Sequence, residues 1–360
     1  MAVYLTIYAV LAILAMVANA RNKNAILVAI AVFLTVFTGL RYETGCDFAG
    51  YLHRFHLDLN PMLEGGPLSS DEWLFGWIMQ RFQQSGRHYV EFLFFMAIII
   101  TTCFVIFAAK FRESVLIIAL LFPIMVIQLA MSGVRQATAT ALLMVAGIAF
   151  ARKQPVLFVL LILIGAEFHR SVILFLPAIL LIGRTISPLK ILLAALVAIP
   201  ASTFLLADRF ETYSERYIQQ IYGDNDAAGG LLRFLLTALT ASPFIWRWRE
   251  VKDRFPVVYP LLQLFALVIV SCLPLIFVST VALHRINYYV MPFAIVIFVY
   301  SMLSIRSEVA RQQMKIGILA LYGLYSLVWF SLSSHADRCY VPYQTILSVD
   351  DIVVETELTY

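Results

Sequence analysis

Residues 115–151 read VLIIALLFPIMVIQLAMSGVRQATATALLMVAGIAFA, an apolar run about twice as long as the ~20 residues that cross a bilayer as one helix. The segment SGVRQ at 132–136 interrupts the run and brings its one charged residue, Arg135. Because a chain in lipid must satisfy its backbone polar groups within helices, such a run folds as two spans joined by a turn. The sequence therefore predicts a helical hairpin in a membrane, with Arg135 at its tip.

The rest of the chain has the same character. Of its 360 residues, 62% are hydrophobic and only 13% are charged, a balance that excludes a water-soluble enzyme. The apolar runs are unbroken, whereas a membrane β-barrel needs alternating strands. Residues 2–18 precede the first basic residues, which is the reverse of a cleaved signal peptide, so they are predicted to stay as a span. We expect an all-α, polytopic transmembrane helical bundle that forms a single integral membrane domain over residues 1–360.

About twelve spans are predicted, and the positions of the basic loops set this number. Short loops rich in Lys and Arg face the cytoplasm, so each successive pair of basic loops must be joined by an even number of crossings. The predicted spans are 3–20, 25–40, 90–109, 114–131, 135–151, 155–168, 171–183, 189–206, 231–246, 257–278, 286–305 and 314–333. Both termini are then extracytoplasmic, as are an outer loop at 41–89, a second at 207–230 and a tail at 334–360.

The distribution of two residue types agrees with this topology. All six lysines fall on the predicted cytoplasmic side, and all six histidines fall on the other side. Further outward turns are predicted at EFHR (167–170) and at HR (284–285). The runs before and after EFHR are too short to cross the hydrocarbon layer fully, so Glu167, His169 and Arg170 are expected to line a recessed, water-accessible cavity.

Four arginines are candidate ligands for a pyrophosphate. Each is predicted at the outer end of a different span: Arg41, Arg135, Arg170 and Arg285. A guanidinium group is always charged and binds phosphate oxygens through two parallel hydrogen bonds. The alternative is that each arginine lies at the membrane interface or pairs with a nearby glutamate.

Three side chains are candidates for proton transfer: Asp47, Glu72 and His169. A general base needs an environment that tunes its pKa and a hydroxyl within hydrogen-bonding reach. Each candidate also has a structural alternative. Asp47 follows Gly45 as a turn residue would, SSDE at 69–72 has the pattern of a capping box, and His169 could be a hydrogen-bonded structural residue.

Aromatic residues are candidates for stacking on sugar rings, namely Tyr51, Trp73 and Tyr288. Those of the first outer loop are also typical of an interfacial belt. The histidines lack the spacing of a metal site, so we expect no metal and no cofactor. Cys46 and Cys339 are both predicted to be outward, and we expect two free thiols because nothing in the sequence shows that they meet.

The order of several short motifs resembles the EpsG family of bacterial membrane proteins, over residues 40 to 343. The motifs are Arg41-x-x-x-Gly45-x-Asp47-x-x-x-Tyr51, EWLF at 72–75, VRQ at 134–136, FHRS at 168–171, Arg285-x-x-Tyr288-Tyr289 and YVPY at 340–343. The resemblance implies a role in exopolysaccharide or O-antigen assembly and a similarity to Wzy polymerases. It also implies roles for the matching residues Arg41, Asp47, Glu72, Arg135, His169 and Arg285.

These expectations combine into one hypothesis: a metal-independent glycosyltransferase of the bacterial inner membrane. It would polymerise undecaprenyl-pyrophosphate-linked oligosaccharide repeats on the outer face, with a lipid-linked donor and a lipid-linked acceptor as its partners. The resemblance adds a chain-length regulator protein as a further partner, and no nucleic acid. Two alternatives stay open: a flippase for the same lipid-linked sugars, and an O-antigen ligase, which differs from a polymerase in its acceptor.

Overall fold

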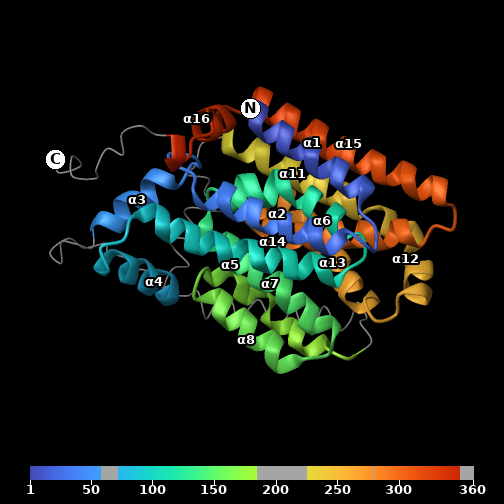
Figure 1. Ribbon diagram of the computed structural model, residues 1–360. Helices are drawn as coiled ribbons and strands as arrows, with labels where there is room; N and C mark the ends of the chain where they lie inside the picture. Colours follow the sequence, from blue (N-terminus) through green and yellow to red (C-terminus); the bar gives the residue numbers. More distant parts are fainter. Residues whose placement is uncertain (58–71, 185–224, 278, 349–360) are drawn as a thin grey trace.

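The computed structural model describes residues 1–57, 72–184, 225–277 and 279–348, without the side chains of Leu57 and of 225–228. In this part of the chain the elements are helices, apart from an isolated bridge between Arg41 and Thr345. The helices are α1 (Ala2–Val17), α2 (Lys23–Gly39), α3 (Phe48–Leu57), α4 (Trp73–Gln84), α5 (Tyr89–Lys110), α6 (Ser114–Leu121), η2 (Phe122–Ala130), α7 (Val134–Ala151), α8 (Pro155–Ala166), η3 (Arg170–Leu181), α11 (Asn225–Ala241), α12 (Pro243–Arg254), α13 (Tyr259–Ser271), η5 (Leu273–Phe277), α14 (Thr280–Leu303), α15 (Glu308–Leu332), α16 (Ser334–Tyr340) and η6 (Ile346–Ser348). Figure 1 shows α3, α4 and α16 at one end of the bundle and α12 at the other.

The chain is an all-α, multi-pass membrane protein by the length and hydropathy of its helices. Within the described residues, six helical segments are long and apolar enough to cross a membrane: Tyr89–Lys110, Val134–Ala151, Gly229–Arg254, Tyr259–Phe277, Thr280–Leu303 and Glu308–Leu332. Shorter apolar helices accompany them, among them α1, α2 and α8. The number of twelve spans is not confirmed. The predicted span 189–206 lies outside the described residues, as do most of the loop 207–230 and the end of the tail.

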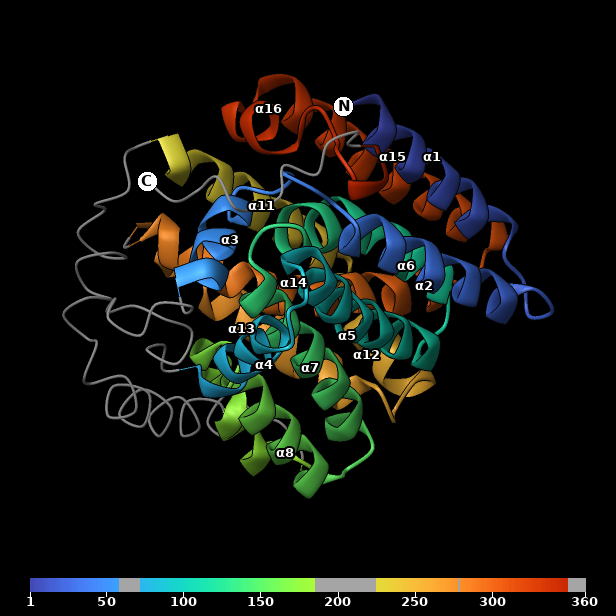
Figure 2. The ribbon, with the colours of Figure 1, turned by 60° about the vertical axis from the view of Figure 1, so that its left-hand side comes forward.

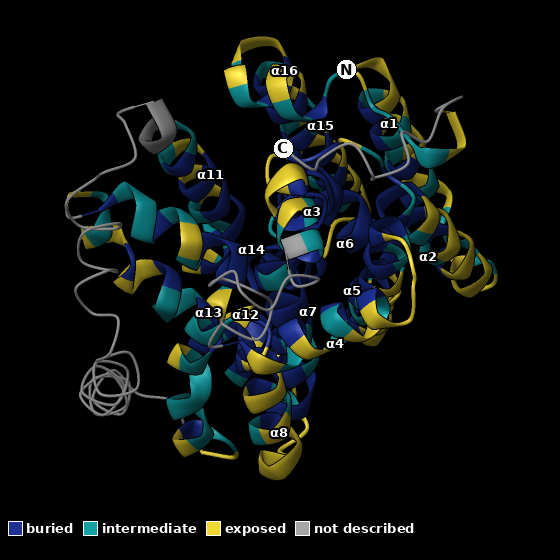
Figure 3. Cartoon of the chain, turned by 90° about the vertical axis from the view of Figure 1, so that its left-hand side faces the viewer, coloured by how far each residue is buried: buried dark blue, intermediate teal, exposed yellow. Residues whose placement is uncertain are grey.

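Helix α14 lies at the centre of the bundle, and 94% of its most apolar 18-residue stretch is buried. It packs against α11, α12, α13, α7 and α6, and Figure 3 shows it in the dark blue interior. A helix that is apolar on every side is stable only when it is covered on every side. The approach of α7 is close because Gly147 has no side chain: a Cβ there would lie 2.5 Å from Phe293 Cε1.

The hairpin predicted from residues 115–151 is present. Its first arm runs through α6 and the π-helix η2, and every residue from Ser114 to Ala130 is buried. Pro123 lies at the start of η2, where its missing N–H disturbs the regular hydrogen-bond ladder. The chain then turns at 131–133, and α7 begins at Val134. Arg135 therefore lies in the first turn of α7, at the tip of the hairpin.

Two predicted loops are helical instead. The turn expected at 284–285 is wrong, because α14 already begins at Thr280, where the Ser279 hydroxyl accepts a hydrogen bond from the Ala282 N–H at 3.1 Å and caps the helix. The basic loop expected after residue 246 is wrong as well, because α12 stays helical to Arg254. The Arg254 guanidinium donates to the Ser304 carbonyl at 2.7 Å, so these basic side chains bind the C-terminal carbonyls of α14.

The two ends of the bundle differ in charge. The end formed by α12 and the start of α15 carries lysines, and there Lys315 Nζ lies 2.7 Å from Glu113 Oε2. The other end, with α3, α4, α16 and the start of α14, carries the six histidines. Residues near both termini also meet at that end, since the Tyr4 hydroxyl donates to the Tyr340 carbonyl at 2.8 Å. Which compartment this end faces stays a prediction.

The segment after α2 is held by the segment after α16. The N–H of Tyr42 donates to the Gln344 carbonyl at 3.0 Å, and the N–H of Gly45 donates to the Cys339 carbonyl at 2.7 Å. Gly45 has φ +106°, and a Cβ there would lie 1.8 Å from the Met131 carbonyl oxygen, so only glycine fits. We call residues 40–46 and 339–346 together the clasp.

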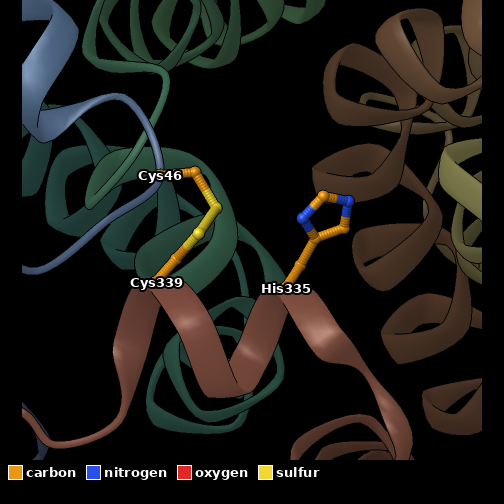
Figure 4. A group of neighbouring side chains, drawn as sticks. All are labelled: Cys46, His335 and Cys339. Carbon is orange, nitrogen blue, oxygen red and sulfur yellow. A yellow bond between two sulfur atoms is a disulfide. The ribbon is translucent and has the colours of Figure 1, made fainter.

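A disulfide joins Cys46 and Cys339 within the clasp (Figure 4). The expectation of two free thiols is therefore wrong. The sequence could not show this pairing because the two cysteines are 293 positions apart. In the fold, the hydrogen bonds of the clasp hold their Cα atoms 4.8 Å from each other. The other two cysteines are free: Cys272 is buried and Cys103 is half-buried.

We expect the clasp to be oxidised in the mature protein. Thiol labelling of the denatured, unreduced protein should modify Cys103 and Cys272 only, and labelling after reduction should modify all four cysteines. Replacing Cys46 and Cys339 by serine should lower stability by about 2–4 kcal/mol, because the cross-link restricts the unfolded chain. Labelling of all four cysteines without reduction would contradict the bond.

Candidate active site

The Glu72 carboxylate lies between a guanidinium and an imidazole. Its Oε2 accepts a hydrogen bond from Arg135 Nη1 at 2.5 Å, and its Oε1 lies 2.7 Å from His169 Nδ1. The Glu72 side chain is 8% exposed, whereas those of His169 and Arg135 are 15% and 32% exposed. The carboxylate is thus covered while both of its partners stay accessible.

Local structure brings these three side chains together. Glu72 immediately precedes α4, in the N-cap position, but its side chain makes no cap hydrogen bond, so it serves Arg135 and His169 and not the helix end. The Phe75 N–H donates to the Glu167 carbonyl at 3.2 Å, which fixes the first turn of α4 to the turn that follows α8. Figure 2 brings this end of the bundle forward and shows α3 and α4 lying there together.

Tyr51 of α3 completes the contacts of Arg135. Arg135 Nε donates to the Tyr51 hydroxyl at 3.1 Å, and its guanidinium carbon lies 5.6 Å from the centre of the Tyr51 ring. Phe75 lies against the same guanidinium at 6.0 Å. Aromatic faces attract cations, so this arginine is held on three sides.

The electrostatics of the site assign different states to Glu72 and Tyr51. Burial raises the pKa of the Glu72 carboxyl, but the hydrogen bond from His169 and the charge of Arg135 outweigh burial, and the pKa lies below its ordinary value. Burial raises the pKa of the Tyr51 hydroxyl, so it stays protonated. Glu72 is therefore an ionised, weakly basic carboxylate that is suited to orienting its neighbours.

His169 is the side chain best placed for proton transfer. An ionised carboxylate can only accept hydrogen bonds, so His169 Nδ1 carries a hydrogen and donates it to Glu72. In the neutral ring, Nε2 then holds the lone pair that accepts a proton. A carboxylate that fixes the tautomer and the orientation of a histidine is a recurrent arrangement in acid–base catalysis.

Asp47 lies beside the same site but is not bonded to it. It is exposed, and its N–H donates to Ser132 Oγ at 3.3 Å. Its Oδ2 lies 3.9 Å from the place where a Cβ on Gly133 would be, and its charge acts on Tyr51. The structure thus puts Asp47 near the start of α7, within electrostatic reach of the Glu72 site.

The remaining predicted arginines divide into two kinds. Arg285 is exposed, and its carbonyl accepts a hydrogen bond from Gln136 Nε2 at 2.8 Å, next to Arg135. Arg170 directly follows His169 and is half-buried. Arg41, in contrast, is only 2% exposed, and it donates to the backbone carbonyls of Thr38, Thr44 and Met131. Its geometry favours a structural role at the end of α2, and its part in phosphate binding stays a prediction.

The predicted sugar-binding residues are not gathered. Tyr51 contacts Arg135, as described, whereas Trp73 is 56% exposed beside Glu72 and stacks on Trp77. Tyr288 is buried, and its hydroxyl lies 2.9 Å from His284 Nε2. Gln136 was not predicted as a site residue, although its place after Arg135 in the VRQ motif could have indicated it.

One group of described side chains has metal-ligand geometry. The ligand atoms of Cys46, His335 and Cys339 lie within 4.8 Å of one another. Figure 4 shows, however, that the two sulfur atoms are bonded to each other. Metal binding by cysteine needs thiolates, so this group offers no metal site while the disulfide is intact.

Comparison with known proteins agrees with the sequence motifs. The model of the EpsG family matches residues 24–345, which is most of the chain and includes the whole Glu72 site. No curated protein and no solved structure matches the chain.

Glu72 should make the stability of the protein depend on acidity. The folded-state pKa of Glu72 is lowered from 4.5, so its stabilising contribution is complete above that value and is lost as the pH falls through the folded-state pKa. Thermal unfolding in detergent should show a Tm that falls in acid for the wild type. Glu72→Gln should have a lower Tm at neutral pH and a smaller fall in acid; parallel curves for the two proteins would contradict the pairing.

Proposed function

The chain belongs to the EpsG family of membrane proteins, and from this premise we propose that it is a polysaccharide polymerase. It would be a glycosyltransferase that joins undecaprenyl-pyrophosphate-linked oligosaccharide repeats into exopolysaccharide or O-antigen. The observation that carries the proposal is the Glu72 carboxylate shared by Arg135 and His169, because it joins an anion-binding group and a proton acceptor in one site.

The proposed mechanism is a single transfer between two lipid-linked chains. The guanidinium of Arg135, with Arg170 and Arg285 nearby, would bind the pyrophosphate of the donor. His169 Nε2 would take the proton from a hydroxyl of the acceptor as that oxygen bonds to the anomeric carbon and the bond to pyrophosphate breaks. Positioned cations stabilise the charge that develops on the leaving pyrophosphate, so no metal ion is required by this scheme. Asp47 is the alternative base.

Two observations support an extracytoplasmic site. The disulfide of the clasp lies at the same end of the bundle as Glu72, and disulfides persist in oxidising compartments. The described lysines lie at the opposite end, as the cytoplasmic side requires. The protein would therefore work at the outer face of the bacterial inner membrane, where lipid-linked repeats are exposed.

The alternatives differ in what they need from the structure. A flippase carries charged groups deep in the membrane along a translocation path, whereas Glu72, Arg135 and His169 lie outside or at the very start of the apolar spans. An O-antigen ligase would use the same donor with another acceptor. Polymer length separates the two enzymes, because a strain without a polymerase still attaches single repeats.

We expect Arg135→Ala and His169→Ala to shorten the polymer to single repeats in a deletion strain complemented with each variant. Losing a charged hydrogen bond to the pyrophosphate, or the base, costs about two orders of magnitude in rate. Polymer length on gels and the amount of protein in membranes are the measurements.

Arg87→Ala is the matched control, because Arg87 lies at the same end of the bundle but forms an exposed ion pair with Glu91 at 3.2 Å. It should give polymer of normal length. If Arg135→Ala and His169→Ala also gave normal polymer at normal protein levels, the proposed chemistry would be wrong.

A further inference from the structure

A second buried arginine lies away from the Glu72 site. Arg233 of α11 is 8% exposed, and its Nη1 donates a hydrogen bond to His284 Nε2 of α14. The same nitrogen lies 2.9 Å from the Tyr288 hydroxyl, and Tyr325 of α15 is within hydrogen-bonding reach of Arg233. We call Arg233, His284, Tyr288 and Tyr325 the Arg233 cluster.

The charge of this cluster is not balanced. A guanidinium group only donates hydrogen bonds, so His284 Nε2 must act as the acceptor and the imidazole is neutral. Within the described part of the chain, Arg233 has no carboxylate partner. A buried cation without a counter-charge is costly, so the cluster is suited to receive an anion.

The hydrogen bonds of Arg233 are also incomplete. Its Nε is buried and has no hydrogen-bond partner among the residues that the structure describes. Arg41 is the internal comparison, because it is also buried but donates to three backbone carbonyls, and no buried nitrogen of its side chain lacks a partner in the described part of the chain. Both arginines are buried, but Arg41 Nε has backbone acceptors, whereas Arg233 Nε has no acceptor within the described residues.

The depth of the cluster matches that of a lipid phosphate. Arg233 contacts His284, which is the fifth residue of α14 (Thr280–Leu303). At 1.5 Å per residue, His284 lies roughly 6 Å inside the start of that apolar helix, close to the boundary between headgroups and hydrocarbon. Gly229 leaves room beside the guanidinium, since a Cβ there would lie 3.3 Å from Arg233 Nη2.

The cluster is at the same end of the bundle as the Glu72 site. His284 belongs to it, and the next residue, Arg285, is joined to Gln136 beside Arg135. The start of α14 therefore lies between two separate guanidinium groups. A polymerase must hold two lipid diphosphates at once, one on the donor and one on the acceptor.

We propose that the Arg233 cluster is a second anion-binding site, which holds the phosphate of a lipid diphosphate while the Glu72 site holds another. The guanidinium supplies the charge, and the hydroxyl of Tyr288 supplies a neutral donor. The assignment to the acceptor chain rests on the proposed polymerase function; the binding of an anion does not.

Native mass spectrometry of the full-length protein in detergent tests this proposal, with a sugar-free polyprenyl diphosphate as the probe. The wild type should bind two molecules, Arg233→Gln and Arg135→Gln one each, and the double variant none. The affinity lost at each site should be tenfold or more, as expected for a hydrogen bond to a charged group, about 1.5–3 kcal/mol. Arg87→Gln is the control and should bind two. One molecule on the wild type, or two on Arg233→Gln, would overturn the second site.

Two further measurements identify the ligand and test whether the role of Arg233 is purely structural. Inorganic pyrophosphate that binds at Arg233 as tightly as the lipid would overturn the assignment to a lipid headgroup, whereas weaker binding supports it.

The Tm of unliganded Arg233→Gln should equal or exceed that of the wild type, because an uncompensated charge is removed. A lower Tm with unchanged lipid binding would assign Arg233 a structural role. Normal polymer from Arg135→Ala would refute the polymerase mechanism alone and leave this binding test intact.

Discussion

The Glu72 carboxylate connects parts of the chain that sequence separates widely. Arg135 is 63 residues away and His169 is 97 residues away, yet each contacts one of its two oxygens. The packing of α7 against α8 brings the start of α7 and the turn after α8 to the same end of the bundle. The shared acid and the backbone bond beside it attach the start of α4 to both of them. Because the carboxylate is buried and charged, losing either partner leaves an unpaired charge. A buried ion pair is stable only when the distances and angles of its hydrogen bonds are favourable. The arrangement of the histidine-bearing end follows from this requirement.

The location of the helices could be read from the sequence because hydropathy reports the solvent that surrounds a segment. The hairpin over 115–151 and its turn illustrate this, since lipid requires apolar side chains wherever a helix crosses it. Hydropathy was misleading where polar residues lie inside a helix. His284 and Arg285 looked like a turn, but they belong to the first turns of α14, which the Ser279 cap begins.

The candidate site was predicted as a set of residues and not as a set of contacts. Glu72, Arg135, His169 and Tyr51 were all identified from their types and their neighbours in the sequence, and the structure joins them. Pairings across the fold cannot be derived from spacing, which explains why the bond between Cys46 and Cys339 was not expected. The same limit hid the difference between Arg41 and Arg233, because a buried arginine looks alike in sequence whether or not each of its N–H groups has an acceptor.

The clasp has an implication for how the molecule is made. Residues 40–46, which lead directly into Asp47, exchange hydrogen bonds with residues 339–346. A polypeptide still being inserted into the membrane has no such partner until almost the whole chain has left the ribosome. The end of the bundle that carries the Glu72 site would thus stay unassembled until synthesis is almost complete, and an incomplete translation product would lack the activity proposed for that site.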